Sequence, residues 1–140
     1  MKTLIIIITH ANTASAFIEA VKNMNIETDN KNLLAYDIQN TDEPKAACEK
    51  ILGDINNKDT SKNTDHSVLF ITDLIGSTPY NIAKQSCEAY KKTNTHHQSA
   101  LITGLNLPML LKILTYQHLP APELAQKVCA AICDCIFYEA

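Results

Sequence analysis

The chain has 140 residues, a length that suits one domain spanning residues 1–140 with a sizeable core. Its hydrophobic fraction of 46% and charged fraction of 19% are those of an ordinary soluble globular protein, and a formal charge of -3 gives no broad attraction to nucleic acid or anionic lipid. We therefore discount both as partners. We also expect a cytoplasmic protein, because no stretch approaches the roughly twenty apolar residues that span a bilayer and the N-terminal aliphatic run is too short for a signal peptide.

The chain opens with a strand and a helix. Residues 3–8 form a short aliphatic run rich in β-branched side chains, which predicts a fully buried strand. Apolar side chains then recur at helical spacing over residues 14–24, and either Asn12 or Thr13 is available as the N-cap. The sequence therefore predicts a strand, a loop and a helix.

A second, weaker unit follows. Residues 33–38 are predicted to form a strand, and Pro44 fits the first turn of a helix over residues 45–55. The polar stretch 56–65 contains no apolar residue, which predicts a solvated loop before the next strand.

The third unit contains the most distinctive loop. Residues 67–72 are predicted to form a strand, and residues 73–79 the loop after it. Pro79 at the first helical position, with Thr78 as the cap, predicts a helix that runs to about Lys91.

The last part of the chain repeats the alternation. We expect a strand over residues 98–103, a short helix over 109–116 and a C-terminal helix from Glu123 onwards. The closing residues 136–138 are candidates for one further strand.

This alternation predicts an α/β fold: a doubly wound, mainly parallel four-stranded sheet with helices on both faces. In such sheets, ligands bind outside the carboxyl ends of the strands, at the switch point of the strand order. If the first and third strands are neighbours, the loops that carry His10 and Asp73 meet there.

His10 is the candidate reactive residue, although a lone histidine at a strand end is more often structural. An imidazole can carry a phosphoryl group when a partner fixes its tautomer. We predict that Nδ1 of His10 faces Asp73 and that Nε2 takes the phosphoryl group. The simpler interpretation of Asp73, as a strand-end turn residue, stays open at this point.

The phosphoryl oxygens need donors. The hydroxyl of Thr78 and the backbone amides that follow Gly76 can bind them at a helix N-terminus, and Ser77 and Asn12 are weaker candidates. Thr78 could instead be a plain helix cap.

The five cysteines are odd in number and argue against a secreted disulfide framework. Cys129 and Cys133 are four residues apart, but their apolar neighbours favour core packing over a metal site. A metal hydrolase using His66, His96 and His97 is also disfavoured, because no carboxylate stands at ligand spacing. We therefore predict no metal and no cofactor.

Three motifs together carry a family resemblance: the strand that ends in Thr9 and His10, FITDLIGSTPYNIA at residues 70–83, and TGLNLPML at 103–110. In their order and spacing they resemble the IIA component of the mannose family of the bacterial phosphoenolpyruvate-dependent sugar phosphotransferase system. The likeness covers nearly the whole chain.

The resemblance implies a phosphotransferase whose His10 accepts a phosphoryl group from the histidine-containing phosphocarrier protein and passes it to a separate IIB component for sugar uptake. It implies that Asp73 orients His10 and that Thr78 helps to hold the phosphate. It also implies that Asn106, Pro108 and Met109 line the site and support partner docking. The family's final strand is exchanged within a homodimer, which would give residues 136–138 a use, and the membrane is reached only through a sugar permease.

Two residues depart from the family pattern: Ala11 and Ser77 stand where glycine is common. Both carry a Cβ that restricts the backbone, so the departures bear on loop geometry and partner choice.

Two alternatives use the same residues. The chain could be a regulatory protein whose phosphorylation controls a partner without sugar transport, or the phosphoryl-donor subunit of a dihydroxyacetone kinase. The 76–81 loop and the segment 106–108 look closer to the mannose type.

Overall fold

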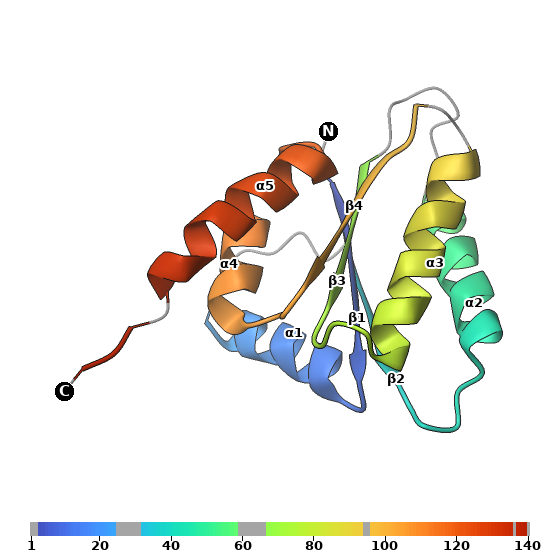
Figure 1. The fold of residues 1–140 in the computed structure, drawn as a ribbon, viewed down its shortest axis with the longest axis horizontal. Helices are drawn as coiled ribbons and strands as arrows, with labels where there is room; N and C mark the ends of the chain where they lie inside the picture. The colour runs from blue at the N-terminus through green and yellow to red at the C-terminus, as the bar shows by residue number, and fades with distance from the viewer. Residues whose placement is uncertain (1–2, 25–31, 59–66, 94–95, 136, 140) are drawn as a thin grey trace.

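The computed structural model describes residues 3–24, 32–58, 67–93, 96–135 and 137–139 (Figure 1). Strands and helices alternate as predicted. The strands are β1 (Leu4–His10), β2 (Leu33–Ile38), β3 (Ser67–Thr72) and β4 (Gln98–Thr103). The helices are α1 (Thr13–Asn23), α2 (Pro44–Lys58), α3 (Thr78–Thr93), α4 (Leu107–Thr115) and α5 (Ala121–Ile132), followed by a 3₁₀ turn, η2 (Cys133–Cys135).

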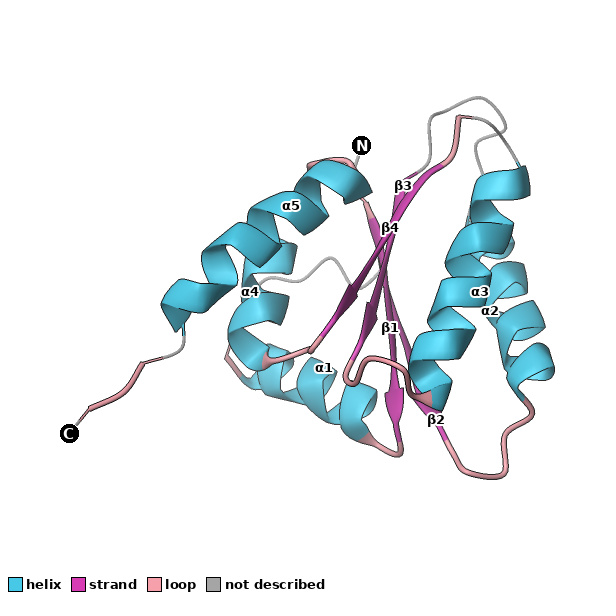
Figure 2. Ribbon diagram, in the orientation of Figure 1, coloured by secondary structure: helices cyan, strands magenta, loops and turns pink. Residues whose placement is uncertain are grey.

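The four strands form one parallel sheet in the order β2-β1-β3-β4, which confirms the predicted fold class. Helices α1, α4 and α5 cover one face, and α2 and α3 cover the other (Figure 2). Strands β1 and β3 are the two central strands and are hydrogen-bonded neighbours. Their carboxyl ends therefore lie together, as the expected switch point requires.

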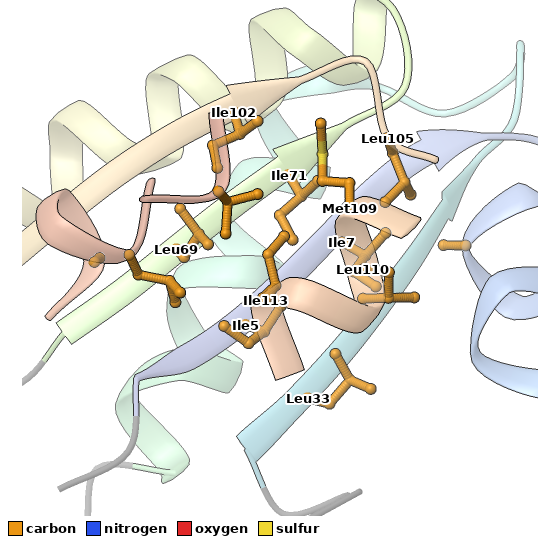
Figure 3. Close-up of a cluster of buried hydrophobic side chains, with 14 of the residues drawn as sticks. Ile5, Ile7, Leu33, Leu69, Ile71, Ile102, Leu105, Met109, Leu110 and Ile113 are labelled. Carbon is orange, nitrogen blue, oxygen red and sulfur yellow. The ribbon is translucent and has the colours of Figure 1, made fainter. Parts of the chain in front are cut away.

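Burial on both faces explains the aliphatic run in β1. Ile5 and Ile7 point into the core beneath α1, α4 and α5 (Figure 3), whereas Ile6 and Ile8 point into the core beneath α2 and α3. All four side chains are completely buried. Such a strand has no polar face, so an unbroken apolar run is what its position demands.

Some predicted boundaries were wrong. Helix α2 continues to Lys58, so the first three residues of the expected 56–65 loop are helical, and the remaining seven lie outside the described residues. Helices α4 and α5 each begin two residues earlier than predicted.

The C-terminal strand is not formed in the described part of this single chain. Phe137 and Tyr138 belong to no strand and are each 84% exposed, and position 136 lies outside the described residues. Figure 1 shows this end of the chain leading away from the sheet. A strand needs a neighbouring strand for its hydrogen bonds, and among the described residues Phe137 and Tyr138 pair with none.

The expected core packing of Cys129 and Cys133 was wrong. Cys129, Cys133 and Cys135 are exposed, because they fall on the outer side of α5 and in η2, whereas Cys87 is buried. The described residues contain no group of three or more side chains suited to a metal ion. No helix among the described residues combines the length and apolar character needed to cross a membrane.

Candidate functional site

His10 is the last residue of β1 and is bonded twice to Asp73, which directly follows β3. The backbone N–H of His10 donates to Oδ2 of Asp73 at 3.0 Å, and the ring Nδ1 lies 2.9 Å from the same oxygen. The imidazole is 44% exposed, whereas the Asp73 side chain is 20% exposed. The pairing of β1 with β3 therefore places a fixed carboxylate against one ring nitrogen and leaves the ring open to solvent.

This contact determines the tautomer of His10. An ionised carboxylate only accepts hydrogen bonds, so the hydrogen in the contact belongs to Nδ1. In the neutral ring, Nε2 then keeps its lone pair, and no described residue forms a hydrogen bond with it. The sequence prediction that Nδ1 faces Asp73 is thus confirmed as geometry.

The surroundings of Asp73 favour its ionised form. Burial raises the pKa of the Asp73 carboxyl, but the backbone N–H of His10, the His10 ring and the N–H of Leu74 together lower it below its ordinary value. The Leu74 N–H donates to Oδ1 at 2.8 Å, so both carboxylate oxygens are occupied. Asp73 is therefore held as an anion that can stabilise positive charge on the imidazole.

The segment after β4 supports Asp73 from the other side. The N–H of Gly104 donates to the Asp73 carbonyl at 3.1 Å, and the N–H of Leu105 donates to the Thr72 carbonyl at 3.0 Å. Gly104 has a φ of +87°, a conformation that side chains with a Cβ rarely adopt. Backbone contacts between two loops thus fix Asp73.

Ser77, and not Thr78, is the cap of α3. The carbonyl of Ser77 accepts from the N–H of Asn81 at 2.9 Å, so the helical ladder starts at Ser77. Its Oγ accepts weakly from the N–H of Tyr80, at 3.4 Å, and donates to the carbonyl of Leu74 at 2.7 Å. The predicted cap was therefore wrong by one residue, and the exposed Thr78 hydroxyl is not used for capping.

The turn before Ser77 depends on glycine. Gly76 has a φ of +77°, and a Cβ built on it would meet no atom within 4 Å, so the backbone and not space requires glycine there. Ser77 itself is not among the described residues with positive φ. A serine at this position is therefore compatible with the loop.

The start of α1 is capped from another strand. Asn12 occupies the N-cap position but makes no capping hydrogen bond with its side chain. Instead, the carboxylate of Asp37 in β2 accepts from the N–H of Ala14 at 2.8 Å. Asp37 was not predicted from the sequence as a functional residue, although a charged side chain at the carboxyl end of a strand was an available signal.

The three expected docking residues differ in exposure. The Asn106 side chain caps α4 by accepting from the N–H of Met109 at 2.9 Å. Pro108 is exposed, whereas Met109 is only 4% exposed and packs in the core beneath α4. Of the three, Asn106 and Pro108 are therefore the two that can face a partner here.

Together these groups make up the candidate site, and their chemistry suits an anion that carries an electrophilic atom. A nitrogen lone pair at Nε2, a carboxylate behind Nδ1 and the positive end of α3 with a spare hydroxyl all lie at one edge of the sheet. This set suits nucleophilic attack by the imidazole on a phosphoryl group.

Comparison with known proteins gives a consistent result. A family model described as "PTS system fructose IIA component" (EIIA-man) matches residues 4–131. The fold is similar to that of phosphotransferase system component EIIA from Streptococcus agalactiae, with a TM-score of 0.76 at 18% identity, covering 96% of this chain and 95% of that one. It is equally similar to the mannose/sorbose-specific IIA subunit from Enterococcus faecalis, with a TM-score of 0.76 at 17% identity, covering 100% and 96%.

A third structure extends the comparison. The PTS IIA protein associated with the fucose utilization operon of Streptococcus pneumoniae matches with a TM-score of 0.70 at 19% identity, covering 99% of this chain and 96% of that one. Each likeness extends over almost the full length of both chains. The shared feature is thus the whole fold and not one motif.

Proposed function

The chain belongs to the EIIA-man family of phosphotransferase-system IIA components, and from this premise we propose that it is a phosphoryl carrier that works through His10. The observation that carries the proposal is the contact of 2.9 Å between Nδ1 of His10 and Asp73, which leaves Nε2 as the nucleophile. The donor is the histidine-containing phosphocarrier protein, and the acceptor is a separate IIB component.

The transfer step balances without a cofactor. The Nε2 lone pair of His10 attacks the phosphorus of the donor phosphohistidine, a new N–P bond forms, and the donor's N–P bond breaks and returns its electron pair to the donor ring. Asp73 keeps its hydrogen bond to Nδ1–H as the His10 ring gains positive charge. Transfer to the IIB component is the same step in reverse.

The first turn of α3 receives the phosphoryl oxygens. Pro79 has no N–H, and the N–H of Tyr80 is directed at Ser77 Oγ, so the hydroxyl and the N–H of Thr78 are the groups that remain on this turn. Gly76 shapes the loop, and Ser77 acts mainly as its cap. Asn12, whose side chain does not cap α1, is a further candidate ligand.

Partner proteins dock around this edge of the sheet. Leu74 is 59% exposed and Ile75 is 67% exposed, and they directly follow Asp73. Neighbouring large apolar side chains that face solvent are a feature of protein interfaces. With Asn106 and Pro108 they form the docking surface that we propose for the phosphocarrier and the IIB component.

We also propose a homodimer in which the C-terminal tail of each copy covers the other. Strand β4 is an edge strand, and Phe137 and Tyr138 are exposed in the single chain. Light scattering should give the mass of two chains for the wild type and a lower mass for the double variant Phe137→Ser, Tyr138→Ser. A monomeric wild type would contradict this part of the proposal.

Intact-mass analysis tests the carrier function. After incubation with phosphoenolpyruvate, enzyme I and the phosphocarrier, the wild type should gain one phosphoryl group that is labile to acid and stable to alkali. His10→Ala should gain none. His118→Ala, which removes an exposed histidine outside the site, is the matched control and should behave like the wild type. A folded wild type that gains no mass would overturn the proposal.

A further inference from the structure

Asp37 lies beside the reactive histidine but is not part of its hydrogen-bonded pair. In the register of β1 and β2, Asp37 pairs with Thr9, and the next residue, Ile38, pairs with His10. The N–H of Ala11 donates to the Ile38 carbonyl at 3.0 Å, which extends the ladder one residue past His10. Asp37 is thereby anchored at the level of the site.

Both carboxylate oxygens of Asp37 are used on the first turn of α1. Oδ1 accepts from the N–H of Ala14 at 2.8 Å and from the N–H of Ser15 at 3.4 Å, and Oδ2 accepts from the hydroxyl of Ser15. A helix N-cap usually comes from the residue that precedes the helix. Here the cap comes from strand β2 and links α1 to β2.

The backbone conformation of the two residues between His10 and α1 depends on these Asp37 contacts. Ala11 has a φ of +45°, in the left-handed region that residues other than glycine avoid. A strained backbone of this kind persists only where surrounding contacts hold it in place. On the N-terminal side, Ala11 is held by strand β1. On the C-terminal side, Asp37 binds the first turn of α1, in which Ala14 is completely buried.

We infer that Asp37 is a positioning residue for His10: it holds the first turn of α1, and so keeps the strained Ala11 turn in the conformation that seats Nδ1 of His10 on Asp73. The inference rests on the proposed function, because the geometry it protects is that of a phosphoryl acceptor. It goes beyond that function because it gives a role to a residue whose hydrogen bonds go to Ala14 and Ser15 and not to the imidazole.

Asp37 has a second effect on the same site. A helix N-terminus attracts anions through its free N–H groups and its positive dipole end. In α1 the N–H groups of Ala14 and Ser15 are already taken by a carboxylate. An incoming phosphoryl group is therefore directed to α3, where Thr78 is available.

Four variants separate positioning from folding. Asp37→Ala removes the cap, whereas Asp37→Asn keeps an oxygen that can accept from the Ala14 N–H. Ser15→Ala removes one contact of the three. Asp42→Ala is the matched control, because Asp42 also accepts a backbone N–H near the end of β2, from Gln39 at 2.7 Å, but forms no hydrogen bond with the described residues of α1.

Two measurements are made on each variant. One is the single-turnover rate of His10 phosphorylation by the phosphorylated phosphocarrier. The other is the fraction of His10 that carries its hydrogen on Nδ1 in the unphosphorylated protein, from ring ¹⁵N NMR. The second measurement needs no phosphorylation, so it tests the role of Asp37 even if the proposed function fails.

We expect Asp37→Ala to lower the rate on the order of tenfold, as loss of orientation does, and to lower the Nδ1–H fraction. Ser15→Ala should lower the rate about twofold to threefold by the same mechanism. Asp37→Asn should restore most of the rate, and Asp42→Ala should match the wild type.

A folded Asp37→Ala with the wild-type rate and tautomer would overturn the inference. If Asp37→Ala does not fold, the Ser15→Ala variant tests the positioning role instead. An unchanged rate and tautomer in Ser15→Ala would then leave Asp37 with a role in stability alone and would also overturn it. A wild type that is not phosphorylated at all would instead count against the carrier function, and the NMR comparison would still stand.

Discussion

The junctions from β1 to α1 and from β3 to α3 each position one residue of the His10–Asp73 pair, but different contacts stabilise them. Each takes the chain from the carboxyl end of a central strand into a helix at the same edge of the sheet. The first junction presents His10, and the second presents Asp73. They meet in the two hydrogen bonds from His10 to the Asp73 carboxylate.

The junctions differ in where their support comes from. The loop before α3 uses its own residues: Gly76 supplies the left-handed turn and Ser77 supplies the cap. The turn before α1 instead places Ala11 in the left-handed region and takes its cap from Asp37, which is 23 residues beyond the Ala14 amide that it binds. The turn and the cap before α3 are therefore local, whereas the cap of α1 comes from a tertiary contact.

The difference also separates two electrostatic roles. The N-terminus of α1 is neutralised by a carboxylate of the protein, whereas the first turn of α3 keeps the Thr78 hydroxyl available. Two similar helix starts at one edge of a sheet need not both bind anions. Which one is available depends on the side chains that reach it from elsewhere in the fold.

The largest expected effect comes from breaking the link between the junctions. Asp73→Asn should lower the free energy of unfolding by about 2 kcal/mol at neutral pH, because three N–H donors lose a charged acceptor. The pKa of Asp73 is lowered in the folded protein, so its stabilisation is present above the unfolded value of about 4 and is lost as pH falls through the folded value. The difference from the wild type should shrink on acidification.

Urea unfolding between pH 7 and pH 2 measures this. Asp42→Asn is the control, since Asp42 is exposed and accepts a single N–H, from Gln39. It should change the unfolding free energy by less than about 0.5 kcal/mol. An Asp73→Asn deficit that is equally large at both ends of the pH range would show that the carboxylate charge is not the cause.

A smaller effect tests the local turn before α3. Gly76→Ala should destabilise the protein by about 1 kcal/mol, because alanine resists the φ of +77° although nothing crowds its Cβ. Gly53→Ala, in the interior of α2 and equally free of close atoms, should stabilise the protein by about 0.5 to 1 kcal/mol. Thermal unfolding of both variants gives the comparison. Two shifts of the same sign would contradict the backbone explanation.

The smallest effect tests the junction that depends on Asp37. Ala11→Gly relieves the left-handed strain but raises the entropy of the unfolded chain, so we expect a net gain of about 0.5 kcal/mol. Ala11→Val should destabilise the protein, because a β-branched side chain tolerates this region least. Equilibrium unfolding in urea distinguishes the two. A destabilised Ala11→Gly would mean that the turn is not strained.

Much of the fold could be predicted from the sequence because its signals are local. The aliphatic run in β1 predicted a strand buried on both faces, and the alternation of elements predicted the parallel sheet. The meeting of His10 with Asp73 was expected only if the first and third strands are neighbours, and the strand order meets that condition. The cap of α3 was misplaced by one residue because Ser77 and Thr78 can both act as caps by chemistry. Only the start of the hydrogen-bond ladder separates them.

What the sequence could not predict depends on tertiary contacts. Nothing near Asn12 indicates that its capping role has passed to Asp37, because the register of β1 and β2 makes that contact. The exposure of Cys129 and Cys133 was missed for a related reason. An apolar helix segment has an outer side whose orientation depends on how the helix packs.

Because 44% of the His10 side chain is exposed, the lifetime of the phosphorylated protein is limited by access of water. A ring so open to solvent cannot exclude water from its own phosphoramidate bond. In the carrier that we propose, the docked partner protein has to exclude water from the site during transfer. Each partner therefore completes the active site. While no partner is bound, hydrolysis of the phosphohistidine competes with transfer to the next partner. The fraction of phosphoryl groups transferred therefore depends on how soon that partner binds.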